Sequence, residues 1–181
     1  AQVFSMMLIV FASDSFPDQS ILSSSAHQFW VIKYGSAMRN DPRYTPSDVF
    51  DTFPRPEPTE WLELIGRALD VERREIMVRR DLGLTKLYSL VNDPEILGDP
   101  DVDRMREIHV ELDEAVMDAY GWSDILLKHG FHTYRQMRRW TVCPEARVEI
   151  LDRLLEENHR RAALQGDVVP TTDDDDEVED E

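Results

Sequence analysis

Three polar side chains in the segment SAMRNDPRYTPS, residues 36–47, have the chemistry needed to contact nucleic acid. Arg39 and Arg43 can each bridge O6 and N7 of guanine, and Asn40 can make the equivalent pair of hydrogen bonds to N6 and N7 of adenine. The same groups can instead bind phosphate and only hold the register of a complex. A further alternative is a solvated turn in which an arginine forms an ion pair with Asp41.

The serine run Ser23–Ser25 would supply a nucleophile only in a suitable setting, and no Gly-x-Ser-x-Gly sequence surrounds it. Serine is a preferred N-cap, so we interpret the run as the start of a helix that continues to Tyr34 and stops at Gly35. In that helix His27 and Trp30 lie one turn apart, which indicates a packing stripe with the histidine capped or half-exposed.

His129 and His132, with Asp124 as a third ligand, would suggest a metal site. Two histidines without a cysteine pair or a further ligand cluster are a weak match, and we predict no metal. The compact basic stretch RQMRR, residues 135–139, would contact the DNA backbone or receive acidic side chains from a neighbouring helix.

The formal net charge of −17 is concentrated at one end of the chain. Nine acidic and no basic residues lie in 167–181, a run that repels itself and predicts a disordered tail. The rest of the chain stays mildly acidic, which is unusual for a protein that binds nucleic acid by itself. A tail of this kind would also serve as a DNA mimic that competes for a basic patch.

A single cysteine, Cys143, excludes an intrachain disulfide and fits a reducing compartment, so we expect a cytoplasmic protein. The apolar opening Val3–Ala12 is too short for a membrane span, has no basic stretch before it, and fits a buried strand. Because the chain begins at Ala1 and its first residues resemble the middle of a sheet, we expect a fragment of a longer protein.

The first part of the chain is predicted to be a small α/β unit. Asp14–Gln19 has the composition of a turn and Ser20–Leu22 that of a short strand, while residues 36–47 form an exposed loop. Phe50 and Phe53 anchor the segment that follows. A stiff linker then separates two units at Pro54, Pro56 and Pro58.

From Thr59 onward the pattern is helical. Thr59 caps a helix that Gly83 interrupts, Leu84–Val91 continues as a short helix, and Asn92–Gly98 is a loop. Asp99 and Pro100 begin a long helix that Gly121 ends, His129–Val142 suggests a hairpin, and Pro144 begins a last helix with Cys143 as a weak N-cap. The apolar faces are predicted to hold Trp61, Leu64, Ile65, Ala68 and Ile76, then Val102, Met105, Ile108, Leu112, Ala115, Val116 and Ala119, and finally Val148, Leu151, Leu154 and Leu155. Trp61, Trp122 and Trp140 are expected in the core or at the interface between the two units.

Several segments, in order, resemble the C-terminal region of type IIL (MmeI-like) restriction–modification methyltransferases. VFSMMLIVFASDSF is similar to a strand pair of that family, LSSSAHQFWVIKYGS to its serine run and helix, and RYTPSDVFDTFPRPEP to its closing motif. LGLTKLYSLVNDP, IHVELDEAVMDAYGW and EILDRLLEENHRR resemble its helical C-terminal domain. Together these segments cover nearly the whole chain except the acidic tail.

The resemblance implies a role that the residues alone do not. Complete members of the family are adenine-specific DNA methyltransferases that use S-adenosylmethionine and are often fused to a nuclease. The loop equivalent to Ala37–Tyr44 lies where target bases are read, so the resemblance implies Arg39, Asn40, Arg43 and Tyr44 as DNA-binding residues. The present sequence departs from the complete enzymes, because none of its seven glycines forms a Gly-x-Gly loop and it has no Asn-Pro-Pro-aromatic motif and no convincing nuclease motif.

We therefore predict an α+β, mainly α chain with three parts: residues 1–58 end a target-recognition domain, 59–166 form a helical domain, and 167–181 are a disordered acidic tail. Expected partners are double-stranded DNA and an upstream methyltransferase domain or subunit, with no membrane. No catalytic residue, cofactor or metal is predicted in this chain, and S-adenosylmethionine is expected only for the longer parent. The alternatives are a helical protein-interaction module and an acidic DNA mimic that does not bind DNA.

Overall fold

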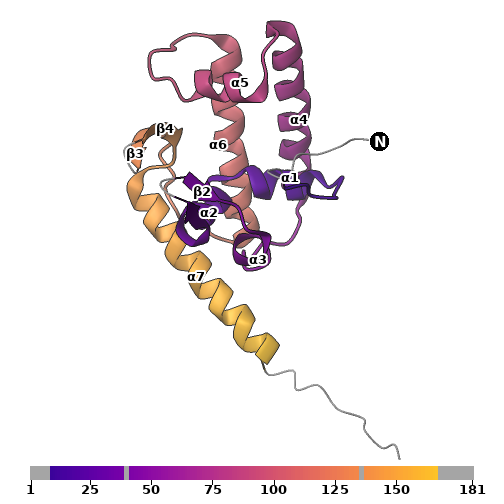
Figure 1. The fold of residues 1–181 in the computed structure, drawn as a ribbon, viewed down its shortest axis with the longest axis vertical. Coiled ribbons are helices and arrows are strands. Elements are labelled where there is room, and N and C mark those ends of the chain that lie inside the picture. The colour runs from indigo at the N-terminus through magenta and orange to yellow at the C-terminus, as the bar shows by residue number, and fades with distance from the viewer. Residues whose placement is uncertain (1–8, 39–40, 135–136, 167–181) are drawn as a thin grey trace, which may run out of the picture.

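The computed structural model describes residues 9–38, 41–134 and 137–166, and helices predominate among them (Figure 1). The helices are α1 (Phe16–Ser23), α2 (Ser25–Tyr34), α3 (Pro46–Val49), α4 (Glu60–Arg80), α5 (Leu84–Val91), α6 (Pro100–Tyr120) and α7 (Pro144–Gly166). The strands form two separate antiparallel hairpins, one of β1 (Ser36–Met38) with β2 (Asp41–Arg43) and one of β3 (Gly130–Tyr134) with β4 (Met137–Thr141). The predicted α+β, mainly α class is confirmed. None of the helices in the described part of the chain is long and apolar enough to cross a membrane.

The two longest helices of the central body, α4 and α6, stand side by side and run in opposite directions (Figure 1). The hydroxyl of Thr59 accepts a hydrogen bond from the backbone N–H of Leu62, which caps α4 as predicted. Asp99 caps α6 in the same way through the N–H groups of Asp101 and Val102. Helix α6 ends at Gly121, whose φ of 75° is the left-handed conformation that glycine adopts without strain.

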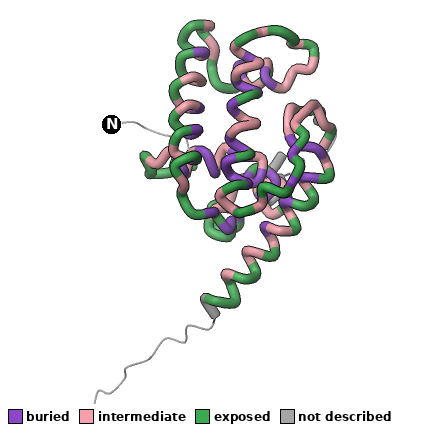
Figure 2. The backbone as a smooth tube through the Cα atoms, turned by 180° about the vertical axis from the view of Figure 1, so that it is seen from behind, coloured by how far each residue is buried: buried purple, intermediate pink, exposed green. Residues whose placement is uncertain are grey.

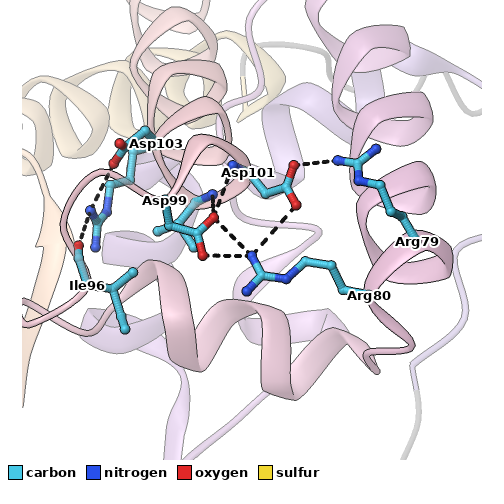
Figure 3. A network of polar contacts seen from close by, with 8 residues as sticks. Arg79, Arg80, Ile96, Asp99, Asp101 and Asp103 are labelled. Carbon is cyan, nitrogen blue, oxygen red and sulfur yellow. Dashed lines mark hydrogen bonds and ion pairs between the residues drawn. The ribbon is translucent and has the colours of Figure 1, made fainter.

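The C-terminal end of α4 is joined to the N-terminal end of α6 by ion pairs (Figure 3). Arg80 lies 2.9 Å from the carboxylate of Asp99 and 3.7 Å from that of Asp101, and Arg79 also pairs with Asp101. Acidic groups at a helix N-terminus and basic groups at a C-terminus both favour the helix dipoles. The network therefore fixes the antiparallel register of the pair.

Buried side chains gather where α1, α2, α4 and α6 meet, whereas the C-terminal turns of α7 are mostly exposed or half-buried (Figure 2). Leu62 and Leu69 of α4 face Met105, Ile108 and Leu112 of α6, and all five are fully buried. The same hydrophobic cluster contains Ile21, Ala26, Phe29, Trp30, Val49 and Phe53 from the first 58 residues. The division of the chain at residue 58 into two units stays a prediction.

Helix α1 packs on α4 at Gly66 with very little space. A Cβ atom at position 66 would lie 2.2 Å from the carbonyl oxygen of Phe16 and 2.6 Å from the hydroxyl of Ser20. That hydroxyl donates a hydrogen bond of 2.8 Å to the carbonyl of Leu62, one turn earlier in α4. The absence of a side chain at Gly66 is what allows the two helices to approach this closely.

The N-terminal elements differ from those predicted. Asp14–Gln19 is not a turn and Ser20–Leu22 is not a strand, because both belong to α1 or its cap. The hydroxyl of Ser15 accepts a hydrogen bond from the N–H of Asp18, and Pro17 occupies the first turn, where its missing N–H costs nothing. The predicted buried strand Val3–Ala12 falls partly outside the described residues, and its described part, 9–12, is exposed and has no regular structure.

Residues 36–47 are not one open loop. They contain the β1–β2 hairpin and the start of α3, which Pro46 begins. The described part of the first 58 residues therefore holds three helices, where the sequence predicted one. Ser, Pro and Asp in close succession favour both a helix N-terminus and a turn. This explains why a turn and a loop were predicted where α1 and α3 begin.

In the remainder of the chain the element predictions are confirmed, but some faces are not. The predicted short helix at 84–91, the hairpin after His129 and the last helix from Pro144 are all present. Trp61, Leu64 and Val148, predicted for the core, are 40%, 59% and 56% exposed. Ile150 of α7, fully buried, replaces Val148 in the core. The predicted acidic tail, 167–181, lies outside the described residues.

Candidate nucleic-acid interface

The β1–β2 hairpin carries the residues that the sequence singled out for DNA contact. Its register pairs Ser36 with Arg43 and Met38 with Asp41, so Arg43 lies in β2 opposite the first residue of β1. Arg39 and Asn40 lie outside the described residues. Tyr44 follows β2 directly and is half-buried. The predicted DNA contacts of all four residues stay a prediction.

A hydrogen-bonded chain ties the base of this hairpin to α2. Nδ1 of His27 lies 2.9 Å from the carbonyl oxygen of Leu22, and Nε2 lies 3.1 Å from the hydroxyl of Tyr44. A carbonyl oxygen only accepts, so Nδ1 carries the proton, and in the neutral ring Nε2 accepts the hydroxyl proton of Tyr44. His27 is therefore buried with both ring nitrogens used, not capped or half-exposed as predicted. Burial raises the pKa of Tyr44, which keeps that hydroxyl protonated and able to donate.

An aromatic cluster packs around the His27 ring and the neighbouring Trp30. The His27 ring packs edge-on against Phe53, with 5.0 Å between centroids, and Trp30 contacts Phe53 and Tyr34. The indole Nε1 of Trp30 donates to the hydroxyl of Thr52 over 3.1 Å. Helix α2 and the segment after α3 are thus locked together, which gives the hairpin a rigid base.

The buried histidines predict a loss of stability in acid. Burial lowers the pKa of His27 and also that of His109. Near and below about pH 6.5 the unfolded chain therefore binds more protons than the folded one. The free energy of unfolding has its highest value above that pH and decreases as the pH falls below it.

We expect the denaturant midpoint to decrease between about pH 7.5 and pH 5.5, and we expect His27→Gln to show a smaller decrease over this interval. The exposed His159 provides the control, since His159→Gln should keep the wild-type slope. Equal slopes for wild type and His27→Gln would contradict this explanation.

A second buried polar cluster joins α2, α6 and the segment before β3. Asp113, whose side chain is 4% exposed, accepts hydrogen bonds from the backbone N–H and the hydroxyl of Ser25, at 2.7 and 2.6 Å. Nε2 of His129, also buried, lies 2.8 Å from the same carboxylate. The Asp113 carboxylate stands between the Ser25 hydroxyl and the His129 ring, so this cluster does not have the serine–histidine–carboxylate order that activates a nucleophilic serine. The cluster is structural, and Ser24 caps α2 as the sequence predicted.

The three residues considered for a metal site do not come together. His129 is paired with Asp113, Nε2 of His132 lies 3.1 Å from the carbonyl of Lys128, and Asp124 forms an ion pair with Arg153. Among the residues that the structure describes, no group of three potential ligands has metal-binding geometry.

Sequence reasoning missed three residues that hold elements of the fold in place: Asp113, Arg106 and Gly66. Asp113 and Arg106 lie on the buried face of α6, and a charged residue at a core position of an apolar helical pattern is the signal that would have marked both. Arg106 donates to the carbonyls of Val91, Asp93 and Ile96 and thereby holds the loop after α5. Gly66 gives a weaker signal, as a lone glycine within a helical pattern.

Comparison with known proteins gives one clear finding. No protein-family model and no curated protein matches the chain. A solved structure, that of the type IIL restriction–modification enzyme MmeI in complex with DNA, is similar over 83% of this chain, with a TM-score of 0.52 and 21% sequence identity. The match covers 17% of the length of that enzyme. The chain is thus similar in fold to a part of a restriction–modification enzyme.

Proposed function

We propose that this chain binds duplex DNA through the β1–β2 hairpin, as the target-recognition and supporting part of a restriction–modification adenine methyltransferase. The observation that carries this proposal is the similarity in fold to MmeI, a restriction–modification enzyme solved with DNA. The hairpin contains Arg43, and Arg39 and Asn40 fall between its strands in the sequence. These residue types suit both base edges and phosphates.

The base of the hairpin supports the proposal physically. Base recognition needs side chains held in a fixed place before DNA arrives, because ordering a loop on binding lowers the affinity. Tyr44, the residue that follows β2, is hydrogen-bonded to His27 of α2. The Trp30–Thr52 hydrogen bond joins α2 to the segment after α3. The helical part of the chain then serves as a brace for the recognition element.

Methyl transfer is assigned to a separate domain or subunit, the proposed partner of this chain. The sequence has no Gly-x-Gly loop of the kind that holds S-adenosylmethionine and no Asn-Pro-Pro-aromatic motif. The residues present do not fit the cofactor, so no step of the methyl-transfer reaction is assigned to them.

The proposal predicts that Arg39→Ala/Arg43→Ala weakens DNA binding at least about 10-fold at low salt, since each well-made contact contributes about 1–3 kcal/mol. Fluorescence anisotropy with a labelled duplex would measure the affinity of the full chain at about 50 and 200 mM salt. Replacing Asp173, Asp174, Asp175 and Asp176 by Asn in every protein compared lowers the negative charge of the tail, which limits any competition with DNA. Arg67→Ala/Arg74→Ala, on the exposed side of α4, makes the same charge change elsewhere and should bind like the wild type. Equal affinities for all three proteins would reject the hairpin as the binding element.

One observation favours a second function, that of a protein-interaction module. Trp61, Leu64, Val71 and Val78 are 40%, 59%, 45% and 78% exposed, and the last three recur every seven residues along α4. A stripe with this spacing is typical of a helix that packs against another helix. Apolar docking of this kind is nearly independent of salt, whereas DNA binding weakens steeply with it, so the salt series separates the two functions.

A further inference from the structure

A shallow groove lies between α5 and β4, and the proposed function assigns no role to it. It has a volume of about 480 Å³ and is lined by Thr85, Tyr88, Ser89 and Asn92 on one side and by Arg138 and Arg139 on the other. Thr85, Ser89 and both arginines are exposed, so the groove opens to solvent. Its lining contains hydroxyl, amide and guanidinium groups and no carboxylate, and the Ser89 hydroxyl and the Asn92 amide already donate to the carbonyls of Thr85 and Tyr88.

The two segments that supply the walls of the groove are basic, although the chain as a whole is acidic. The protein has 37 acidic residues, yet residues 82–92 and 125–143 contain none. These two segments include α5 and the β3–β4 hairpin, the two walls of the groove, and together they carry Lys86, Lys128, Arg135, Arg138 and Arg139. Two acid-free segments that are distant in sequence therefore meet at one surface.

The walls of the groove are held in place by buried contacts. The side-chain oxygen of Asn92 accepts a hydrogen bond of 3.1 Å from the backbone N–H of Trp140, which joins the end of α5 to β4. The guanidinium of Arg106 donates to three carbonyls of residues 91–96 and lies 5.0 Å from the ring of Phe131 and 5.4 Å from that of Trp140. Arg106 thus connects both walls from below, and the groove does not depend on a ligand for its shape.

We propose that this groove binds phosphate groups of a nucleic-acid backbone, as a second DNA contact beside the β1–β2 hairpin. Exposed guanidinium groups are the donors best suited to phosphate oxygens, and the groove is lined by two of them and by no carboxylate. An open, shallow surface suits a polymer that lies across it better than a small molecule that must be enclosed. The contact carries no base specificity, and it fixes the position of the chain on the duplex. The identity of the ligand as DNA rests on the proposed function.

The test is the salt dependence of duplex binding by the full chain. Each phosphate contact contributes about 0.9 to the slope of log affinity against log salt. Arg138→Gln/Arg139→Gln should lower that slope by about 1–2 and weaken binding about 10-fold or more at 50 mM salt, equally for unrelated duplex sequences. Arg138→Lys/Arg139→Lys, which keeps the charge, should retain most of the slope. Arg67→Gln/Arg74→Gln removes two exposed arginines from α4 and should leave the slope unchanged. A thermal melt of each variant checks that the fold is intact.

The outcomes distinguish this inference from the proposed function. An unchanged slope in the folded Arg138→Gln/Arg139→Gln protein, together with loss of binding in the hairpin variant, would overturn the groove and keep the hairpin. A lower slope with no effect of the hairpin variant would support the groove and reject the hairpin. Suppression of DNA binding by millimolar pyrophosphate to the same extent in wild type and the groove variant would reject the groove as the phosphate site. Absence of duplex binding at low salt would reject both.

Discussion

Gly66→Ala is expected to lower the free energy of unfolding by about 3 kcal/mol, at the upper end of what overpacking a core costs. The new Cβ would lie 2.2 Å from the carbonyl oxygen of Phe16, a backbone atom that cannot rotate away. Helix α1 would have to move by about 1 Å to restore an ordinary contact distance. Such a shift also breaks the hydrogen bond from Ser20 to Leu62. Chemical denaturation followed by circular dichroism would measure the change.

The sign of the change in the free energy of unfolding of Gly66→Ala shows whether α1 packs closely against α4 at this position. In an unpacked helix, glycine to alanine stabilises by about 1 kcal/mol, because alanine has the higher helix propensity. Gly83→Ala is the matched control, since a Cβ at position 83 meets no atom within 4 Å. Because Gly83 is the N-cap of α5, where glycine is preferred over alanine, Gly83→Ala should cost about 1 kcal/mol, well below the cost expected at Gly66. A stabilised Gly66→Ala protein would show that α1 does not pack on α4 in this way.

Asp113→Ala is expected to cost about 3–5 kcal/mol, the range for breaking a buried, hydrogen-bonded charge cluster. The substitution leaves the N–H and hydroxyl of Ser25 and Nε2 of His129 without their acceptor. Asp113→Asn keeps an acceptor oxygen and should be less harmful. Denaturant titration at neutral pH gives the two values directly.

The control for this prediction lies on the same helix. Asp118 is exposed, so Asp118→Ala should change the free energy of unfolding by less than about 0.5 kcal/mol. If Asp113→Ala were as mild as Asp118→Ala, the buried cluster would not be what joins α2 to α6. An additional loss of DNA affinity in folded Asp113→Asn would connect the cluster to the position of the hairpin.

The second half of the fold could be predicted from the sequence because its helices begin or end at capping residues that are recognisable in the sequence. Thr59, Asp99 and Gly121 act as caps through local chemistry, so the start of α4 and both ends of α6 could be predicted. Helix α4 ends at Arg80, with Asp81 in the left-handed conformation, before the predicted interruption at Gly83. The buried face of a helix is harder to predict, because it depends on which other elements pack against that helix. Trp61 and Leu64 fit an apolar stripe, yet α6 covers the adjacent face of α4, with Leu62 and Leu69.

The first half was less predictable, since its elements depend on contacts far away in the sequence. Helix α1 is held by Leu62 and Gly66, more than forty residues later. Asp113 lies 88 residues from Ser25, and no local pattern links them. The candidate hairpin residues were found by resemblance to a family and by their chemistry, whereas the His27–Tyr44 anchor required the folded chain.

Backbone amide hydrogen exchange of the full chain, with and without saturating duplex DNA, tests directly whether the β1–β2 hairpin binds DNA. We expect slower exchange on DNA binding in peptides that cover residues 36–44, and also in those that cover α5 and β4. Exchange in the C-terminal turns of α7 should not change. Unchanged exchange in 36–44 at saturating DNA, with protection elsewhere, would contradict the assignment of the hairpin as the DNA-binding element.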